Sequence, residues 1–344
     1  MARVNRIDLL QAMEAVEPGI SQRPTLEQSD CIIARNGYFF TLQNEIFCKS
    51  KSPLDKGIEC AVNGQKILAA IRGIPDMEVD VNIDKEFEIK GKKFSAAVQV
   101  ADKIILPIDQ VEKPEQWSDL HHEFSEAMKL VVECSEKGET LTTVTCLHIH
   151  PKWIEATDRF TFARYRIPSG VTESCLIHSL AARAIQSRFP TRICSTKEWL
   201  HFRNDSGVRL SVRRHIAEYP DMTHYTKQRG KPISFPKVAA DAIKFLELFS
   251  KQNTDDNEIE VKLDQDRVHI DGYGVASRAS YHSKAKYSGK SVGFRIKPAT
   301  LQNLIKEHEG IELVTGEQNN TMLVISSGQY FFMAVTDELR GKKE

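Results

Sequence analysis

The residues Gly289-Lys290-Ser291 could end a phosphate-binding loop, which would give the protein nucleotide chemistry. Such a loop needs a first glycine five residues before the triplet, so that successive backbone N–H groups surround the phosphates. That position is Lys284. The loop must also open into a helix, whereas Val292, Phe294 and Ile296 have the alternate spacing of a strand. The triplet is therefore predicted to be a turn that leads into a strand.

Two histidines could ligate zinc, because His148 and His150 lie two residues apart and would face the same side of a strand. A zinc site needs three or four ligands, and the spacing suggests no further one. The run at residues 121–124, His-His-Glu-Phe, lacks the HExxH spacing of a zinc protease. Asp158 has no second carboxylate that the sequence can place beside it, and no GxSxG motif is present. We predict no cofactor, no metal and no catalysis, and keep an α+β metal-dependent hydrolase using these histidines as an alternative.

The composition is that of an ordinary globular protein, with 344 residues, 41% hydrophobic and 27% charged. No apolar run approaches the ~20 residues of a membrane span, and the charged N-terminal stretch has no apolar signal core. The seven cysteines form no CxxC pair, which favours a reduced, cytoplasmic setting. A formal net charge of zero argues against a surface that is basic all over, but it permits a local basic face.

Three stretches have the same helical stripe of apolar residues and start about 115 residues apart. These stripes are Leu9, Ala12, Met13, Val16; Phe124, Ala127, Met128, Val131; and Ala239, Ala242, Ile243, Leu246. A hairpin-like region follows each stripe, and Asn36-Gly37 is a strong turn signal in the first. A second helix follows in each copy, with these apolar positions: Ile67, Leu68, Ile71; Ala181, Ala184, Ile185; and Leu301, Leu304, Ile305.

The pattern predicts an α+β chain of three tandem modules, each reading helix, strands, helix, strands. Polar, proline-containing stretches at 114–119 and 219–232 mark the boundaries. The predicted modules are residues 1–117, 118–226 and 227–344. The alternative is one irregular α+β domain whose periodicity arises by chance.

Six stretches, in order along nearly the whole chain, resemble motifs of the bacterial DNA polymerase III β sliding clamp family. They are Ser21–Asp30 (SQRPTLEQSD), Ile105–Asp109 (ILPID), Glu155–Tyr165 (EATDRFTFARY), Glu218–Met222 (EYPDM), Tyr287–Ile305 (YSGKSVGFRIKPATLQNLI) and Gln329–Val335 (QYFFMAV). Their order and spacing carry the resemblance more than any single stretch does. The match is divergent, as a phage- or plasmid-encoded version would be.

The resemblance implies three DNA-clamp modules, each with two helices packed on antiparallel sheets, that form half of a six-module ring. Two chains would join head to tail, with helices lining the hole and double-stranded DNA passing through without sequence readout. The cations that would face DNA are Arg23, Lys66, Arg72, Arg183, Arg188, Lys237, Lys244, Lys251 and Lys306. The alternative is that these cations are the ordinary solvated faces of amphipathic helices.

The resemblance also implies an apolar pocket that receives short peptide motifs of a DNA polymerase and a clamp loader. The matching positions are Thr157, Arg159, Phe160, Phe162, Ile177, Ala181, Met333, Ala334 and Val335. The sequence departs from the family's Gly-His-Arg-Leu run, which is Arg-Phe-Thr-Phe at 159–162, and from its terminal Met-Pro-Met, which is Met-Ala-Val at 333–335. These departures predict a narrower pocket or a different peptide preference. The alternatives are half-buried sheet residues without a binding role, and a clamp homologue that binds partner peptides but is not loaded on DNA.

Overall fold

The computed structural model describes residues 2–138, 140–250, 257–315 and 321–339, so the predicted DNA contact Lys251 lies outside the described residues. The first ten elements are β1 (Ala2–Asn5), α1 (Arg6–Glu14), β2 (Cys31–Arg35), β3 (Tyr38–Leu42), β4 (Ile46–Lys51), β5 (Cys60–Asn63), α2 (Gly64–Gly73), β6 (Glu78–Ile83), β7 (Glu86–Lys90) and β8 (Ser95–Gln99). The next ten are β9 (Ser118–Asp119), α3 (Phe124–Val132), β10 (Cys146–His150), β11 (Trp153–Thr157), β12 (Thr161–Tyr165), β13 (Cys175–His178), α4 (Ser179–Gln186), β14 (Arg192–Ser195), β15 (Trp199–Arg203) and β16 (Arg209–Arg213).

The last part of the chain contains β17 (Lys231–Ser234), α5 (Ala239–Ser250), β18 (Ile259–Asp264), β19 (Arg267–Tyr273), β20 (Arg278–Lys284), β21 (Lys286–Tyr287), β22 (Val292–Ile296), α6 (Pro298–Glu307), β23 (Ile311–Thr315), β24 (Thr321–Ser327) and β25 (Tyr330–Glu338). Short 3-10 helices are η1 (Glu17–Gly19), η2 (Ile108–Gln110), η3 (Thr143–Thr145) and η4 (Tyr225–Lys227). Each group reads strand, helix, four strands, helix, three strands, with β21 added in the third. The predicted α+β fold of three repeated modules is confirmed, whereas the exact boundaries stay predictions.

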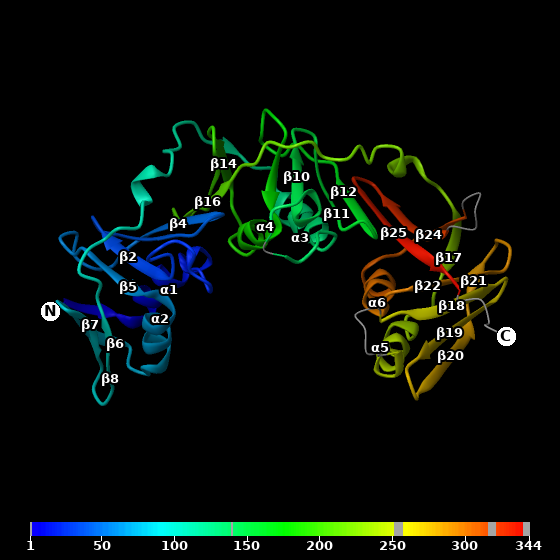
Figure 1. Cartoon of the computed structure of the whole chain (residues 1–344), viewed down its shortest axis with the longest axis horizontal. Coiled ribbons are helices and arrows are strands. Elements are labelled where there is room, and N and C mark those ends of the chain that lie inside the picture. The colour runs from blue at the N-terminus through cyan, green and yellow to red at the C-terminus, as the bar shows by residue number, and fades with distance from the viewer. Residues whose placement is uncertain (1, 139, 251–256, 316–320, 340–344) are drawn as a thin grey trace. The chain divides into compact units, whose positions relative to one another are not determined.

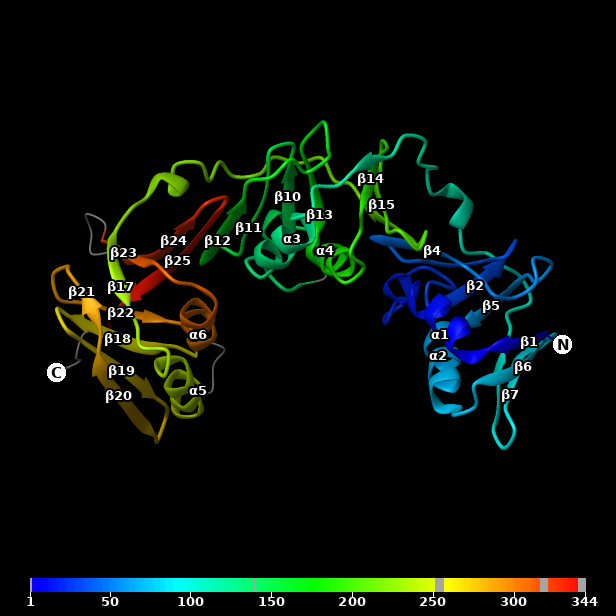
Figure 2. The same cartoon turned by 180° about the vertical axis from the view of Figure 1, so that it is seen from behind.

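The predicted apolar stripes form the buried sides of the helices. Leu9 and Met13 of α1 are fully buried, as are Ala127 and Met128 of α3 and Ile243 of α5. The two helices of each group pack against one another, α1 on α2, α3 on α4 and α5 on α6 (Figures 1 and 2). None of the described helices is long and apolar enough to cross a membrane.

Side chains at the helix starts set where several of these helices begin. Asn5 accepts the N–H of Ile7 at 2.8 Å, and Asn63 accepts the N–H of Lys66 at 3.0 Å. At α4, Nδ1 of His178 accepts the N–H of Leu180 at 3.2 Å. A side-chain acceptor at this position satisfies one of the N–H groups that the first helical turn leaves unpaired.

The chain forms two compact units. The first comprises residues 1–133, 137–154 and 167–218, and the second comprises 134–136, 155–166 and 219–344. In the first unit, one antiparallel sheet has the order β1-β6-β7-β8, and another has the order β5-β2-β3-β4-β16-β15-β14-β9. Strand β10 pairs with β13 in the same unit.

In the second unit, β25 is central to the sheets. It pairs with β12 along Tyr330–Ala334, with β24 along its length, and with β22 at Asp337 and Glu338. Beyond β24 come β23 and β17, and beyond β22 come β18, β19 and β20. The turn predicted at 289–291 does lead into strand β22 and helix α6, so the phosphate-loop interpretation has no helix in the required place.

Equivalent strands join consecutive modules. In the first module, the third strand between the two helices, β4, pairs with the last strand of the second module, β16, in the first unit. In the second module, the third strand between the two helices, β12, pairs with the last strand of the third module, β25, in the second unit. The same edge-to-edge contact therefore occurs twice in one chain.

A buried polar network lies at the first of these joints. Nδ1 of His201 is 2.8 Å from Oγ of Ser211, and Nε2 is 3.0 Å from Oγ1 of Thr196. Burial, with the nearby charge of Arg209, lowers the pKa of His201 to about 3. The imidazole is therefore neutral in the folded protein at ordinary pH.

This shift predicts a loss of stability in acid. Because the folded pKa of His201 lies below its ordinary value of 6.5, the unfolded chain binds more protons as pH falls below that value. The His201 contribution to the free energy of unfolding should fall by about 2 kcal/mol between pH 7 and pH 5. Denaturant unfolding at both pH values measures this, with His201→Gln as the comparison. An equal pH dependence in both proteins would contradict the prediction.

Candidate functional site

The TDRFTF stretch forms the hairpin between β11 and β12. Asp158 holds its tip, because its Oδ1 accepts the N–H of Phe160 at 3.0 Å and the N–H and Oγ1–H of Thr161. Oγ1 of Thr157 donates to the carbonyl of Thr161 at 2.7 Å and accepts the N–H of Arg159 at 3.1 Å. The Thr-Asp pair is thus used to fix a tight turn, which positions the residues that follow it.

Arg159 occupies this turn with a φ of 78°, in the left-handed region that favours glycine. The departure from the family's glycine therefore places a side chain where the backbone conformation disfavours one. For a non-glycine residue this conformation costs about 1–2 kcal/mol.

Arg159→Gly is expected to stabilise the protein by about 0.5–1 kcal/mol, because the relief of strain exceeds the extra flexibility of glycine in the unfolded chain. Thermal unfolding measures this gain. Arg159→Ala is the matched control, since it removes the long side chain and keeps the Cβ atom. A gain in the alanine variant equal to that in the glycine variant would show that backbone strain is not the cause.

An apolar cluster lies behind the hairpin, within the second unit. It contains the buried residues Phe162, Val314, Val324, Phe331 and Met333. Phe162 and Met333 are register partners on β12 and β25, and the ring of Phe162 is 6.0 Å from that of Phe331. The half-buried residues that pack on this cluster are Met222, Tyr225 and Met322. The cluster could serve as the floor of an apolar docking site.

The rim of this site is more exposed than its floor. Phe160 is 54% exposed and Val335 is 38% exposed, and the N–H of Val335 donates to the carbonyl of Phe160 at 2.7 Å. The ammonium group of Lys297 lies 5.0 Å from the centre of the Phe160 ring. Thr157 and Ala334 are buried beside them. The β11–β12 hairpin and the middle of β25 therefore bring seven of the nine predicted pocket residues together.

The other two predicted pocket residues, Ile177 and Ala181, belong to the first unit. Ile177 lies in β13 and Ala181 in α4, and both side chains are fully buried. Their role in a peptide pocket stays a prediction.

A buried ion pair lies next to the apolar cluster. The guanidinium of Arg164 donates to the carboxylate of Glu155 at 2.6 and 2.7 Å, and both side chains are almost wholly buried. Arg164 also lies 5.6 Å from the ring of Phe162 and donates to Oγ1 of Thr223 at 3.4 Å. The pair thus connects the cluster to the segment between β16 and β17.

Sequence reasoning missed Met222, Tyr225, Lys297 and Met322. Met222 and Tyr225 lie in the stretch that the sequence assigns to a module boundary. Two apolar side chains in a polar connecting segment could have indicated that this segment packs on an apolar surface. Lys297 and Met322 carry no such signal, because their positions depend on how β22 and β24 approach β12 and β25.

The predicted DNA-contacting cations fall into two groups. Lys66, Lys237, Lys244 and Lys306 are exposed, and none of the four forms an ion pair with a residue that the structure describes. Arg23 is also exposed, in the loop before β2. The four lysines can reach phosphates without giving up an ion pair to a described residue.

The three remaining arginines are already engaged within the first unit. Arg72 pairs with Glu14 and Glu17, each at 2.9 Å, and Arg183 pairs with Glu133 at 2.7 Å. Arg188 donates to the carbonyl of Glu14 at 2.6 Å. The charges of Arg72 and Arg183 are partly neutralised, and Arg188 is held by a neutral carbonyl, so phosphate contacts through these three would be weaker than the sequence suggests.

The exposed side of α5 is partly apolar. Phe245 is 55% exposed and Leu248 is 65% exposed, on the same side as Lys244. The rings of Phe245 and Phe249 lie 4.9 Å apart. The sequence pattern of lysines every seven residues did not indicate this apolar surface.

The histidines of the hydrolase alternative are adjacent, with ring centres 6.0 Å apart for His148 and His150. His150 stacks on Trp153 at 3.4 Å, and its Nδ1 accepts the N–H of Lys152 at 3.1 Å. Among the described residues, potential metal ligands gather in threes at 121–123 rather than here. These histidines therefore have structural contacts and no third ligand beside them in the described part of the chain.

No protein-family model and no curated protein sequence matches the chain. Solved structures do match it over nearly its whole length. The DNA polymerase III β subunit of Thermotoga maritima aligns with a TM-score of 0.80 at 12% identity, covering 98% of this chain and 99% of that one. A putative DNA polymerase III β subunit from Eubacterium rectale aligns with a TM-score of 0.79 at 12% identity and the same coverage.

A DnaN sliding clamp (DNA polymerase III subunit beta) from Pseudomonas aeruginosa, solved bound to griselimycin, aligns with a TM-score of 0.78 at 10% identity and the same coverage. The chain therefore has the fold of the DNA polymerase III β sliding clamps. The resemblance drawn from the sequence motifs is confirmed at the level of the fold.

Proposed function

We propose that this protein is a DNA sliding clamp, a processivity factor that two copies form by closing head to tail around duplex DNA. The observation that carries the proposal is the repeated joint between modules, in which the third strand after the first helix of one module pairs with the last strand of the next. In the last module the third strand after the first helix is β20, and the last strand of the first module is β8. Among the described strands, β20 pairs only with β19 and β8 only with β7.

A second copy of the chain would supply a second pairing partner for both β20 and β8. Pairing β20 of one copy with β8 of the next repeats the internal joint, and two such contacts close a ring of six modules. The expected register follows from counting residues after each hairpin turn. Ala97 lies as many residues after its turn as Ser211 and Met333 lie after theirs, and Arg278 as many as Phe47 and Phe162. We expect Ala97 to lie opposite Arg278 of the second copy.

Retention on DNA would be topological rather than tight. The five exposed predicted cations are few. Of the other three described ones, Arg72 and Arg183 are partly neutralised by carboxylates, and Arg188 is held by the backbone carbonyl of Glu14. Contacts of this kind are weak, independent of sequence and sensitive to salt, which suits a ring that must slide. No catalytic step is needed for this role, because tethering alone raises the local concentration of a bound polymerase.

The partner would dock on the apolar cluster behind the TDRFTF hairpin. Phe162 and Met333 form its floor, with Phe160 and Val335 exposed at the rim. A short apolar peptide from a DNA polymerase or clamp loader fits this arrangement, in the cytoplasm of a bacterial or phage-infected cell. Arg159 and Phe160 enlarge the rim, so the peptide preference should differ from that of clamps with glycine and histidine there.

Loading on circular and linear DNA tests the proposal. The purified protein, loaded with its clamp loader on nicked circular DNA, should stay bound through a high-salt gel filtration. It should be lost when the circle is cut once by a restriction enzyme. Equal loss from both forms would overturn the clamp proposal. Peptide binding that persists without any retention would instead support the non-loading homologue.

A further inference from the structure

A row of four cations crosses the sheet of the first unit, one on each of the neighbouring strands β4, β16, β15 and β14 (Figures 1 and 2). Side chains that are register partners on antiparallel strands lie on the same face of the sheet. The successive partners are Lys49, Arg209, Arg203 and Arg192. Because neighbouring strands lie about 4.8 Å apart, this cation row is about 14 Å long.

The cation row lies on the face of the sheet that is turned away from the helices. Successive side chains of a strand point to opposite faces, and Phe202 is the neighbour of Arg203 in β15. The ring of Phe202 is 5.8 Å from that of Phe124 in α3. The row is therefore separate from the cations of the helices that are predicted to contact DNA.

Aromatic rings, rather than carboxylates, contact three of the four cations. The distances between cation and ring centre are 3.8 Å for Lys49 and Tyr38, 4.8 Å for Arg209 and Phe47, and 4.7 Å for Arg203 and Trp117. None of these three cations forms an ion pair with a residue that the structure describes.

The middle of the row has uncompensated charge. Nε of Arg209 is buried and has no hydrogen-bond partner among the described residues. Burial lowers the pKa of Arg209 to about 10. Burial and the nearby charges of Arg209 and Lys113 lower the pKa of Lys49. Both shifts are those of cations that lack an anion beside them.

Two carboxylates lie at the edge of the row. Asp119 is 3.4 Å from Nε of Arg192, at the end of the row. Asp205, in the turn after β15, accepts Oγ1–H of Thr191 at 2.8 Å and keeps its own charge. With Lys113, the cluster has five cations and these two carboxylates, so it keeps an excess of positive charge.

The acids of the segment that leaves the first module are engaged elsewhere. The guanidinium of Arg35 donates to Asp109. Glu112 accepts the N–H of Glu198 at 3.0 Å, and both Glu112 and Glu115 line a separate pocket beside the β14–β15 turn. These contacts hold the acids of this segment away from the middle of the row.

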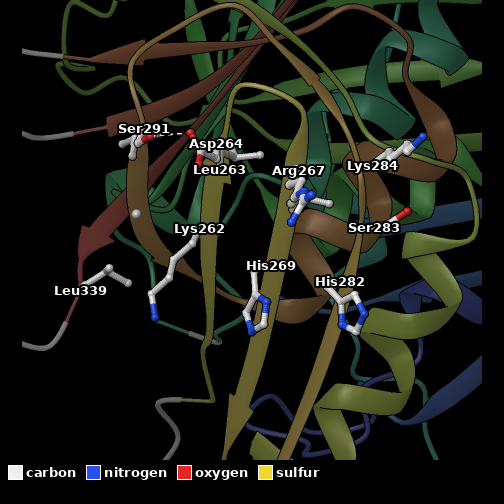
Figure 3. Close-up of a pocket in the computed structure, with 13 residues that line it drawn as sticks. Lys262, Leu263, Asp264, Arg267, His269, His282, Ser283, Lys284, Ser291 and Leu339 are labelled. Atoms are coloured by element: carbon white, nitrogen blue, oxygen red, sulfur yellow. Dashed lines mark hydrogen bonds between the residues drawn. The ribbon is translucent and has the colours of Figure 1, made fainter.

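A second group of cations shows the arrangement that this row lacks. In the second unit, Lys262 and His269 line a groove together with Asp264 (Figure 3). Glu260 is 3.9 Å from Lys262, and Asp271 is 3.2 Å from His269. Acids alternate with the cations there, whereas in the first unit they lie only at the edge of the row.

We propose that the cation row binds the phosphate backbone of a single-stranded nucleic acid. Like charges directly opposite one another destabilise a sheet, and an anion along the row would remove this repulsion. A row about 14 Å long fits a chain of phosphates rather than one small ion. Three of the four cations are arginines, whose planar guanidinium can donate two hydrogen bonds to one phosphate.

Aromatic side chains beside the row favour a nucleic acid over an acidic peptide. Tyr38, beside Lys49, is 38% exposed, and Trp117, beside Arg203, is half-buried. Unpaired bases stack on such rings while cations hold the phosphates. This site goes beyond the proposed clamp function, because it requires neither ring closure nor DNA at the helices.

Fluorescence anisotropy with a labelled oligothymidylate of about 16 nucleotides tests the proposal on the full chain. Lys49→Gln/Arg203→Gln should bind it about tenfold more weakly at low salt, because two phosphate contacts are lost. The slope of log affinity against log salt concentration should become shallower by about 1.4, at about 0.7 for each contact. Lys262→Gln/Lys284→Gln is the matched control, since it removes two exposed cations from the groove of the second unit and should leave binding unchanged.

Variants of Tyr38 test the contribution of base stacking. Tyr38→Leu should weaken binding of the same oligonucleotide about fivefold, because it removes the ring and keeps an apolar side chain. Tyr38→Phe is the matched control, since it keeps the ring, and it should bind as the unaltered protein does. Equal losses in the two variants would show that the bases do not stack on Tyr38 and would contradict the proposed single-stranded ligand.

Three results would overturn the proposal. They are absence of saturable binding below about 1 mM, equal losses in the row variant and its control, and tighter binding of a labelled polyglutamate peptide through the same two cations. Loss of binding in Lys237→Gln/Lys244→Gln but not in the row variant would also overturn it, whereas retention on circular DNA tests the clamp separately. Thermal unfolding checks that the variants are folded, and if the double variant is not, Lys49→Gln alone should reduce the salt slope by about 0.7.

Discussion

A protein carrying Ala97→Pro is expected to run as a single chain of 39.0 kDa under conditions in which the unaltered protein, as the proposed dimer, should run at twice that mass. Antiparallel strands alternate residue pairs that exchange hydrogen bonds with pairs that do not. The bond from Gly91 to Phe94 fixes this alternation in the β7–β8 hairpin and leaves the N–H of Ala97 pointing away from β7. Proline at 97 therefore removes a donor needed by a second copy and keeps the hairpin's own hydrogen bonds.

The dissociation constant of the dimer should rise about a hundredfold or more, as measured by light scattering over a range of concentrations. Ala97→Val is the matched control, because it adds bulk at the same position and keeps the N–H group. Equal masses for the proline and valine variants at every concentration would contradict the proposed pairing of β8 with β20.

The second large effect is expected at the buried ion pair. Arg164→Met should lower the free energy of unfolding by about 3–5 kcal/mol, because it leaves the carboxylate of Glu155 buried without its guanidinium partner. Denaturant unfolding monitored by tryptophan fluorescence and circular dichroism measures the loss. The same variant should weaken peptide docking, since Arg164 also contacts the ring of Phe162.

The double variant Glu155→Leu/Arg164→Met separates charge from packing. Replacing both partners with apolar groups removes the uncompensated charge, so most of the lost stability should return. If the double variant is as unstable as Arg164→Met alone, then side-chain packing rather than the unpaired carboxylate explains the loss.

The repeated architecture could be predicted from the sequence because its signals are local. Helical stripes such as Leu9 and Met13 must be buried by a neighbour, and they are. Asn36-Gly37 predicts a two-residue hairpin turn, and both residues have the positive φ that this turn requires. Such patterns depend only on nearby residues, so divergence of the rest of the sequence does not hide them.

The candidate site was predicted less completely because its parts come from distant segments. Phe162 and Met333 were identified through motifs, but Tyr225 and Lys297 reach the site only through the packing of other strands. The spacing of cations in the sequence also does not show which of them will pair with acids in the folded protein. Arg72 has the spacing of a phosphate contact, yet two acids from a separate segment already hold it.

The pairing of β25 with both β12 and β22 affects how the second unit unfolds locally. Its first half is hydrogen-bonded to β12 and its last residues to β22, while β24 covers its other edge. Strand β25 cannot separate from β12 without disturbing its pairing with β22 and β24. The backbone amides of these strands should therefore exchange with deuterium together, and more slowly than those of the β7–β8 hairpin.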